Sequence, residues 1–167
     1  MKSIRNIALS ALLTFSAFTA VVYTSCNKDE CKDVVCQNGG TCADGICTCD
    51  AGYEGTRCEI ASATKFLGNY DVSEQCSISG NVGPYSATIS QSSTSAVTIL
   101  LQNFGDFQAT ITVSGTVNGN TLTIPQQTVS GYTVSGSGTY NNGVISIPYT
   151  VSGVVNSESC TATWTKK

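Results

Sequence analysis

The sequence contains no histidine and few charged residues. Only 11% of its 167 residues are charged, and the formal net charge is -3. The lack of histidine excludes histidine-dependent acid–base catalysis and histidine metal ligands. The basic footprint that nucleic acids require is also missing, so we expect no nucleic-acid partner. No helical hydrophobic period appears from residue 66 on, which favours an all-β fold.

An uncharged apolar segment lies near the amino terminus. Lys2 and Arg5 precede residues 7–22, IALSALLTFSAFTAVV. These sixteen residues are fewer than the about 20 that a membrane-spanning helix needs. A short positive region followed by an apolar region is typical of export signals, so we predict a signal peptide at 1–25 and exclude it from the fold. An uncleaved membrane anchor is the alternative.

The chain has nine cysteines, so at least one lacks a partner within it. Cys26 directly follows the small residues Thr24 and Ser25 after the apolar segment. This stretch resembles a bacterial lipoprotein signal, with Tyr23 where that motif usually has Leu. The resemblance implies a Cys26 that becomes the mature amino terminus and carries acyl chains, each buried CH₂ adding about 0.8 kcal/mol of membrane affinity. Signal removal further along the chain is the alternative.

Residues 26–30 are expected to form a short acidic tether. The sequence NKDE after Cys26 resembles signals that send some lipoproteins of Gram-negative bacteria to the outer face of the outer membrane. The resemblance implies a surface-exposed outer-membrane lipoprotein. A periplasm-facing lipoprotein and a plain solvated tether are the alternatives.

Six cysteines lie close together in CKDVVCQNGGTCADGICTCDAGYEGTRC, which begins at residue 31. This density indicates an oxidising compartment in which disulfides persist. A segment this short cannot bury a sufficient core, because domains below about 40 residues usually need covalent staples. Spacing alone leaves the pairing open, and a Cys-x-Cys zinc knuckle is the rival interpretation.

The cysteine spacings, with NGGTC before the third cysteine and GYEGTRC into the sixth, resemble an epidermal-growth-factor-like (EGF-like) module over residues 31–59. Glycines of the module, Gly52 among them, suit tight turns with positive φ. The resemblance implies three disulfides: Cys31 with Cys42, Cys36 with Cys47, and Cys49 with Cys58.

Some EGF-like modules bind calcium through acidic and amide residues just before the first cysteine. Asn27, Asp29 and Glu30 match that lead-in by type, and calcium prefers such oxygen ligands. The second half of the family's pattern is incomplete, because the loop ADGI has Asp44 but no aromatic residue. We therefore expect a metal-free module without a cofactor, with those three residues as weak calcium candidates.

The composition changes after residues 60–65, which we interpret as a linker. Residues 66–167 are rich in Ser, Thr, Gly, Val and Ile and contain eight alternating runs of strand length. Asn118-Gly119 and Asn142-Gly143 predict tight hairpins. Short connections favour an up-and-down meander, and eight such strands close naturally into an antiparallel β-barrel without free edges. A β-sandwich is the alternative. The expected strands lie at 68–79, 85–92, 96–104, 107–117, 121–127, 132–140, 143–153 and 157–166.

Alternation assigns one apolar face to these strands. Cys76 in the first strand and Cys160 in the last would be neighbours in a closed barrel. We predict a buried disulfide between them, with Cα atoms about 4.4–6.8 Å apart. Cys26 is then the unpaired cysteine. The predicted inward residues are Tyr70, Val72, Cys76 and Ile78, then Phe107, Ala109, Ile111 and Val113, and then Ile145, Ile147, Tyr149 and Val151.

The start of this domain, FLGNY, resembles the Gly-x-Trp start of lipocalin-like barrels, with Tyr70 in place of Trp. That resemblance implies a carrier for a small apolar or glycan ligand in the barrel interior. A barrel of this size is nevertheless expected to be filled by its own side chains. Trp164 shares a face with Cys160 and Ala162, which predicts core packing for it.

Glu74 is the candidate for acid chemistry. Alternation puts it on the apolar face, where burial would shift its pKa. The preferred interpretation is a bulge or strand end that returns Glu74 to water. No second acid forms a glycosidase pair with it by sequence, and no Gly-x-Ser-x-Gly motif is present. A hydrolase using Glu74 is thus the minor alternative, and we expect no enzyme.

Taken together, the patterns predict an exported, lipid-anchored cell-envelope lipoprotein. We expect it to act as a binding or display module for an unknown extracellular protein or glycan.

Overall fold

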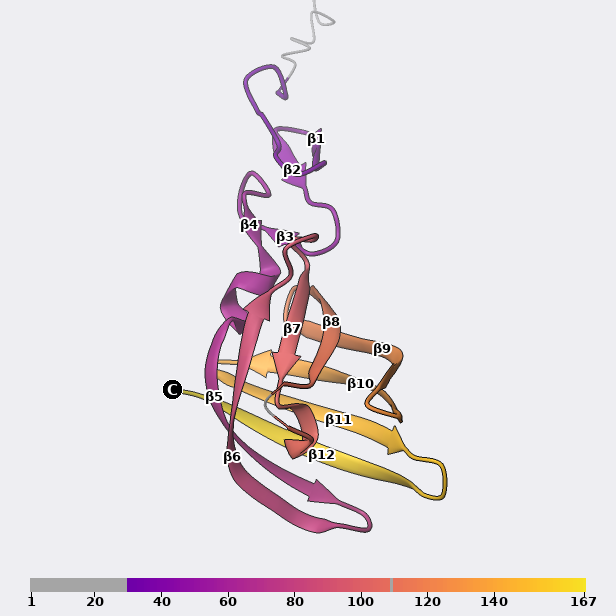
Figure 1. Ribbon diagram of the computed structural model, residues 1–167. Helices are drawn as coiled ribbons and strands as arrows, with labels where there is room; N and C mark the ends of the chain where they lie inside the picture. The colour runs from indigo at the N-terminus through magenta and orange to yellow at the C-terminus, as the bar shows by residue number, and fades with distance from the viewer. Residues whose placement is uncertain (1–29, 109) are drawn as a thin grey trace, which may run out of the picture.

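A computed structural model describes residues 30–108 and 110–167 of the chain (Figure 1). The predicted signal peptide, Cys26, Asn27 and Asp29 lie outside the described residues. Within those residues no helix is long and apolar enough to cross a membrane. Their regular structure is β-strand apart from two short 3-10 turns.

Eight antiparallel strands form a closed barrel, with every strand beside its neighbours in sequence and the last beside the first. This is the predicted up-and-down topology, and the β-sandwich alternative is wrong. The hydrogen-bonded seam between first and last strands leaves the barrel no free edge. The strands are β5 (Gly68–Cys76), β6 (Gly80–Gln91), β7 (Thr98–Gln102), β8 (Thr112–Asn118), β9 (Thr121–Val129), β10 (Tyr132–Asn141), β11 (Val144–Ser152) and β12 (Ser157–Lys166).

The two asparagine–glycine sequences make hairpins, as predicted. Asn142 and Gly143 connect β10 to β11 with φ angles of 46° and 86°, the positive values that a tight hairpin turn needs. The β8–β9 hairpin lies one residue later than predicted, because β8 includes Asn118 and the connection is Gly119-Asn120.

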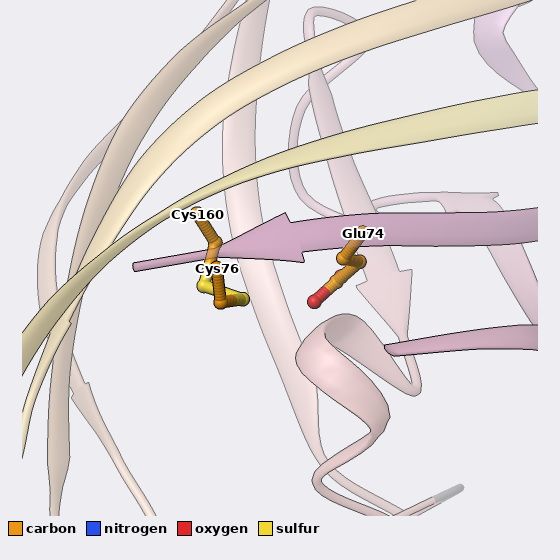
Figure 2. A group of neighbouring side chains, drawn as sticks. All are labelled: Glu74, Cys76 and Cys160. Carbon is orange, nitrogen blue, oxygen red and sulfur yellow. A yellow bond between two sulfur atoms is a disulfide. The ribbon is translucent and has the colours of Figure 1, made fainter. Parts of the chain in front are cut away.

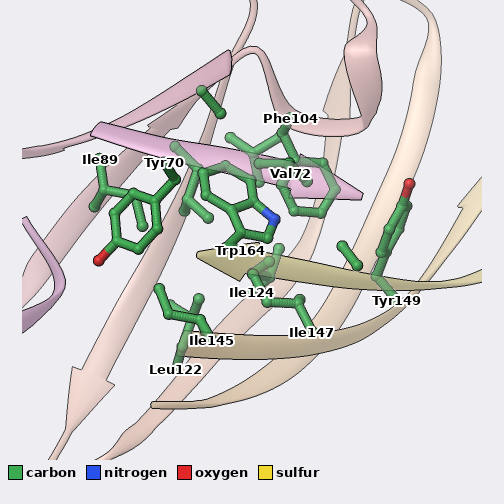
Figure 3. Packing of buried hydrophobic residues seen from close by; sticks show 14 of the residues in the cluster. Tyr70, Val72, Ile89, Phe104, Leu122, Ile124, Ile145, Ile147, Tyr149 and Trp164 are labelled. Carbon is green, nitrogen blue, oxygen red and sulfur yellow. The ribbon is translucent and has the colours of Figure 1, made fainter. Parts of the chain in front are cut away.

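Side chains fill the barrel interior (Figure 3). Trp164, Tyr70, Phe66 and Phe104 are fully buried. The Trp164 ring lies 5.7 Å from that of Tyr70 and 6.1 Å from that of Phe104, measured between centroids. Trp164 therefore has the core position that its alternation predicts. This packing gives no support to a carrier that holds its ligand in the interior, and that hypothesis stays a prediction.

The β7–β8 connection differs from the sequence prediction. We expected a strand from Phe107, whereas β8 begins at Thr112. The chain instead forms the 3-10 turn η2 (Phe104–Asp106), which inserts the buried Phe104 ring into the barrel end. Phe107 and Ile111 are consequently half-buried connection residues, and only Val113 of the predicted group is a buried strand residue. Ala109 lies outside the described residues.

Ile78 is a second departure from the predicted inward face. The strand β5 ends at Cys76, so Ile78 belongs to the β5–β6 turn, where its side chain is 65% exposed. Strand alternation no longer applies to a residue beyond the end of the ladder.

The cysteine-rich segment forms two small antiparallel pairs. They are β1 (Thr41–Ala43) with β2 (Ile46–Thr48), and β3 (Tyr53–Glu54) with β4 (Ile60–Ala61). Three disulfides hold this segment together with Cα separations between 5.3 and 5.9 Å, and each strand pair is too short to be stable alone. The pairs are those that the EGF-like resemblance implies: Cys31–Cys42, Cys36–Cys47 and Cys49–Cys58.

The module and the barrel meet in a packed junction. Residues 60–65, interpreted as a linker, form β4 and most of the 3-10 turn η1 (Ser62–Phe66), whose Ala63 and Phe66 are fully buried. The Gly52 amide donates to Asn118 Oδ1 at 3.1 Å, which ties the module to the β8–β9 hairpin. We call this end of the barrel the proximal end. The distal end carries the β5–β6, β7–β8, β9–β10 and β11–β12 connections.

Candidate functional site

The distal end contains an open cleft of about 720 Å³. All four distal connections contribute to it, so segments far apart in the sequence meet there. A cleft of this volume lies within the range of about 300–1,000 Å³ that is usual for ligand sites. The residues that characterise it, which we call the distal cleft, are Ile78, Phe107, Tyr132, Val154, Val155 and Glu158.

Apolar side chains make up much of the distal cleft. Val154 and Val155 of the β11–β12 turn are 100% and 88% exposed, and Tyr132 is 44% exposed. The rings of Phe107 and Tyr132 stack with an interplanar angle of 2° and a centroid separation of 5.3 Å. Exposed apolar side chains and a stacked aromatic pair therefore line the same cleft.

Glu158 supplies a fixed negative charge at the wall of the cleft. Its Oε2 accepts hydrogen bonds from the amides of Ile78 and Ser79 at 3.3 and 3.0 Å, and the Ser79 hydroxyl donates to Oε1 at 3.0 Å. These bonds, that of the Ser79 amide first, lower the pKa of Glu158, so it is ionised at neutral pH. Glu158 thereby fixes the β5–β6 turn against β12.

Glu74 is buried just beneath the distal end. Tyr149 donates to its Oε2 at 2.8 Å, and the Tyr85 hydroxyl donates to its Oε1. An irregularity does occur here, because Val72 pairs with Tyr85 whereas Glu74 pairs with Val82. The extra residue lies in β6, so β5 keeps its alternation and Glu74 stays 5% exposed. The interpretation that a bulge returns Glu74 to water is therefore wrong.

Burial dominates the titration of Glu74. It raises the pKa of the carboxyl group, while the hydrogen bonds from Tyr85 and Tyr149 lower it and the charges of Asp106 and Glu158 raise it. Burial also raises the pKa values of Tyr85 and Tyr149. Both oxygens of Glu74 have partners, the arrangement expected of a satisfied buried polar group. Hydrolysis through Glu74 stays an untested hypothesis.

Glu74, Cys76 and Cys160 form a cluster whose oxygen and sulfur atoms lie within 4.8 Å of one another (Figure 2). Cys76 and Cys160 are joined by a disulfide, so their sulfurs are not thiolate ligands and the cluster is not a metal site in the oxidised protein. Both cysteines are buried, as predicted. Their Cα separation of 4.0 Å is shorter than the predicted range, and the two residues lie directly opposite each other across the β5–β12 seam.

Glu30, the calcium candidate within the described residues, is exposed at their start. The remaining two candidates lie outside those residues, so calcium binding stays a hypothesis.

Glu74→Gln should change how the stability of the barrel depends on pH. The folded-state pKa of Glu74 is raised above its ordinary value of 4.5, so the folded protein binds more protons than the unfolded chain between the two values. The contribution of Glu74 to stability is thus fully present below about pH 4.5 and is lost as the pH rises through the folded-state pKa. Urea unfolding from pH 4 to 8 should show that the free energy of unfolding of the glutamine variant increases relative to that of the wild type as the pH rises.

Glu158→Gln is the matched control, because its folded-state pKa is shifted in the opposite direction. Its favourable contribution is present at neutral pH and is lost on acidification. If the free energies of unfolding of the wild type and of Glu74→Gln changed with pH in parallel, that result would contradict a buried Glu74 with a raised pKa.

No family model matches the chain. It is 41% identical over 46 residues to a neurogenic locus notch homolog protein of Giardia intestinalis, a match that covers 26% of this chain. The chain spans only 8% of the length of that protein. The match supports an EGF-like region in the disulfide-rich segment. It is too short to indicate the function of the whole protein.

Proposed function

We propose that this protein is a lipid-anchored, surface-exposed lipoprotein of the bacterial cell envelope that binds an extracellular partner in the distal cleft. The observation that carries the proposal is the position of the cleft, which is lined by the distal connections at the barrel end opposite the disulfide-rich module. Figure 1 shows the course of these connections and of the module. The module immediately follows Cys26 and its acidic tether in the sequence. If Cys26 carries acyl chains, the EGF-like module is a stalk and the cleft points away from the membrane.

The packed junction supports a stalk that holds the barrel in a defined orientation. Lys65 forms a 3.0 Å ion pair with Glu54 of the module and donates to Asn120 of the β8–β9 hairpin at 2.8 Å. Its side chain therefore bridges the two parts of the molecule. A partly exposed ion pair adds little free energy by itself, but it restricts rotation where hydrogen bonds and buried residues already fix the contact.

The chemistry of the distal cleft favours binding over catalysis. Its charged lining residue, Glu158, is held in three hydrogen bonds, and Glu74 is buried away from solvent. General acid–base catalysis needs a titratable group within reach of the substrate, with a pKa near the working pH. Exposed apolar side chains and a stacked aromatic pair instead provide the contact area that recognition uses.

Cys26→Ala should release the protein from membranes and abolish incorporation of a labelled fatty acid. Without the thiol there is no thioether linkage to lipid, and the apolar segment is too short for a standard membrane span. Cell fractionation and metabolic acyl labelling measure the two effects. A Cys26→Ala protein that stays in the membrane fraction would favour the uncleaved anchor.

Tyr132→Ala tests the second part of the proposal, that the distal cleft is the binding site. It should leave acylation and accessibility to external protease unchanged, while the purified protein loses binding on peptide and glycan arrays. Thr161→Ala is the control, because this residue lies on the exposed outer wall of β12. It should leave acylation, accessibility to protease and array binding unchanged. A wild-type protein that binds nothing on the arrays, or binding that is insensitive to Tyr132→Ala, would count against the distal cleft as the binding site.

A further inference from the structure

The basic side chains of the barrel lie at one end, and its acidic side chains lie at the other apart from Asp71, which forms a 2.8 Å ion pair with Lys167. Lys65, Lys166 and Lys167 lie at the proximal end, where the Lys166 ammonium group donates to the Lys65 carbonyl at 3.1 Å. Glu158 lies near the start of β12, and Asp106 lies in η2, both at the distal end. The remaining described basic residues, Lys32 and Arg57, belong to the disulfide-rich module. The distal end is therefore the acidic end of the barrel.

Among the residues that the structure describes, no lysine or arginine lines the distal cleft, and Glu158 is the charged residue that does. A cleft with charge of one sign and low-dielectric walls concentrates the electric field inside it. Phosphate, sulfate and carboxylate groups would meet an uncompensated negative field there. A positively charged group is the ionic species that this field attracts.

Asp106 and Glu158 act on the same region. Asp106 is exposed and immediately precedes Phe107, whose ring forms one wall of the cleft. Both carboxylates raise the pKa of Glu74, the acid buried beneath the same end of the barrel. A cation in the distal cleft would be attracted by the charge of Glu158 on β12 and by that of Asp106 in η2.

The aromatic pair is suited to the same kind of ligand. The face of a phenol or phenyl ring attracts cations, and Tyr132, stacked on Phe107, is still 44% exposed. The aliphatic stem of a lysine or arginine can pack on such a ring while its charged head points at carboxylates. Beside the rings, Ile78, Val154 and Val155 add exposed apolar side chains to the same cleft.

We propose that the distal cleft binds a lysine or arginine side chain that a partner protein presents between apolar residues. This inference rests on the proposed binding function and names its ligand class. The cation packs against the stacked Phe107–Tyr132 pair in the field of Asp106 and Glu158. Flanking apolar residues of the partner contact the exposed valines of the β11–β12 turn.

Synthetic peptides can test the assignment with the full-length acylated protein in detergent. The probes are acetylated and amidated peptides with a central arginine flanked by leucine and valine. Matched peptides carry citrulline, which has nearly the shape of arginine without its charge, or glutamate at the central position. We expect the arginine peptide to bind about tenfold more tightly than the citrulline peptide, with an advantage that shrinks as salt is added.

Two substitutions assign the effect to the cleft. Tyr132→Ala should weaken binding of the arginine peptide about tenfold, and Asp106→Asn should weaken it by a smaller factor, about threefold. Asparagine tolerates the positive φ of 54° at position 106, so this change removes charge without requiring a new backbone conformation. Thr161→Ala should bind both peptides as the wild type does, and the citrulline peptide should be insensitive to Asp106→Asn.

Equal binding of the arginine and citrulline peptides, tighter binding of the glutamate peptide, or no binding of any of them would overturn the cationic assignment. The proposed function would survive if the arrays still showed binding that depends on Tyr132, for example to a neutral glycan. It would fail together with this inference only if neither arrays nor peptides revealed a ligand that depends on the distal cleft.

Discussion

Replacing Cys76 and Cys160 together by alanine should lower the free energy of unfolding of the barrel by about 4 kcal/mol. The disulfide joins positions 84 residues apart, and a cross-link over a loop of that length restricts the unfolded chain strongly. It also lies on the seam between β5 and β12, where the first and last strands of the barrel must stay paired. Trp164, the single tryptophan, is buried in the barrel and reports the transition by its fluorescence in a urea titration.

Replacing Cys49 and Cys58 by alanine is the control for a general effect of removing disulfides. That pair closes a short loop in the disulfide-rich module, so the Trp164 transition should move much less. Peptide mapping without reduction should find the module's three disulfides intact in the Cys76/Cys160 variant. If the Cys76/Cys160 variant unfolded at the same urea concentration as the wild type, backbone pairing alone would hold β5 and β12 together.

Much of the barrel could be predicted because its signals are local. Asn142-Gly143 encodes a hairpin through two positive φ angles, and alternation along β11 places Ile145 and Ile147 inside. Closure was predicted from eight strands with short connections, and the neighbouring positions of Cys76 and Cys160 followed from that closure. The register of β5 and β12 pairs these residues directly.

The burial of Glu74 could not be predicted from the residues next to it in sequence. An irregularity was expected near it, and one is present, but whether the extra residue lies in β5 or β6 decides which way Glu74 points. Gly83 and Pro84 on β6 were the available signal, since both residues are typical of interrupted strand ladders. The burial of Glu74 also depends on Tyr85 and Tyr149, whose hydroxyl groups provide its hydrogen bonds.

The distal cleft could not be predicted by any sequence pattern. Ile78, Phe107 and Val154 lie on three different connections and Tyr132 begins β10, so these residues meet only because the barrel closes. Two of them were expected on the inward face of a strand, because an apolar residue in a turn and one in a strand look alike in sequence. The insertion of Phe104 decides where β8 begins, and it depends on space in a core that only the whole barrel defines.

Gly52→Ala should separate the disulfide-rich module from the barrel, because the native contact would cost the alanine about 2–5 kcal/mol. Gly52 has a φ of +88°, which costs an alanine about 1–2 kcal/mol. An added Cβ would also lie 2.3 Å from Val97 Cγ1 and 3.0 Å from the Val117 carbonyl oxygen, both in the barrel. Overpacking of this kind typically costs about 1–3 kcal/mol, and moving the module away from the barrel relieves it.

Gly45→Ala distinguishes this contact from simple backbone strain. Gly45 lies in the same module with a φ of +76°, but the nearest atom to an added Cβ is 3.5 Å away. Both variants should keep the three module disulfides and the Trp164 unfolding transition. Only Gly52→Ala should increase the radius of gyration in small-angle scattering and expose residues 60–65 to protease. If the two variants behaved alike, the junction would contribute no fixed orientation, and the stalk could not hold the distal cleft away from the membrane.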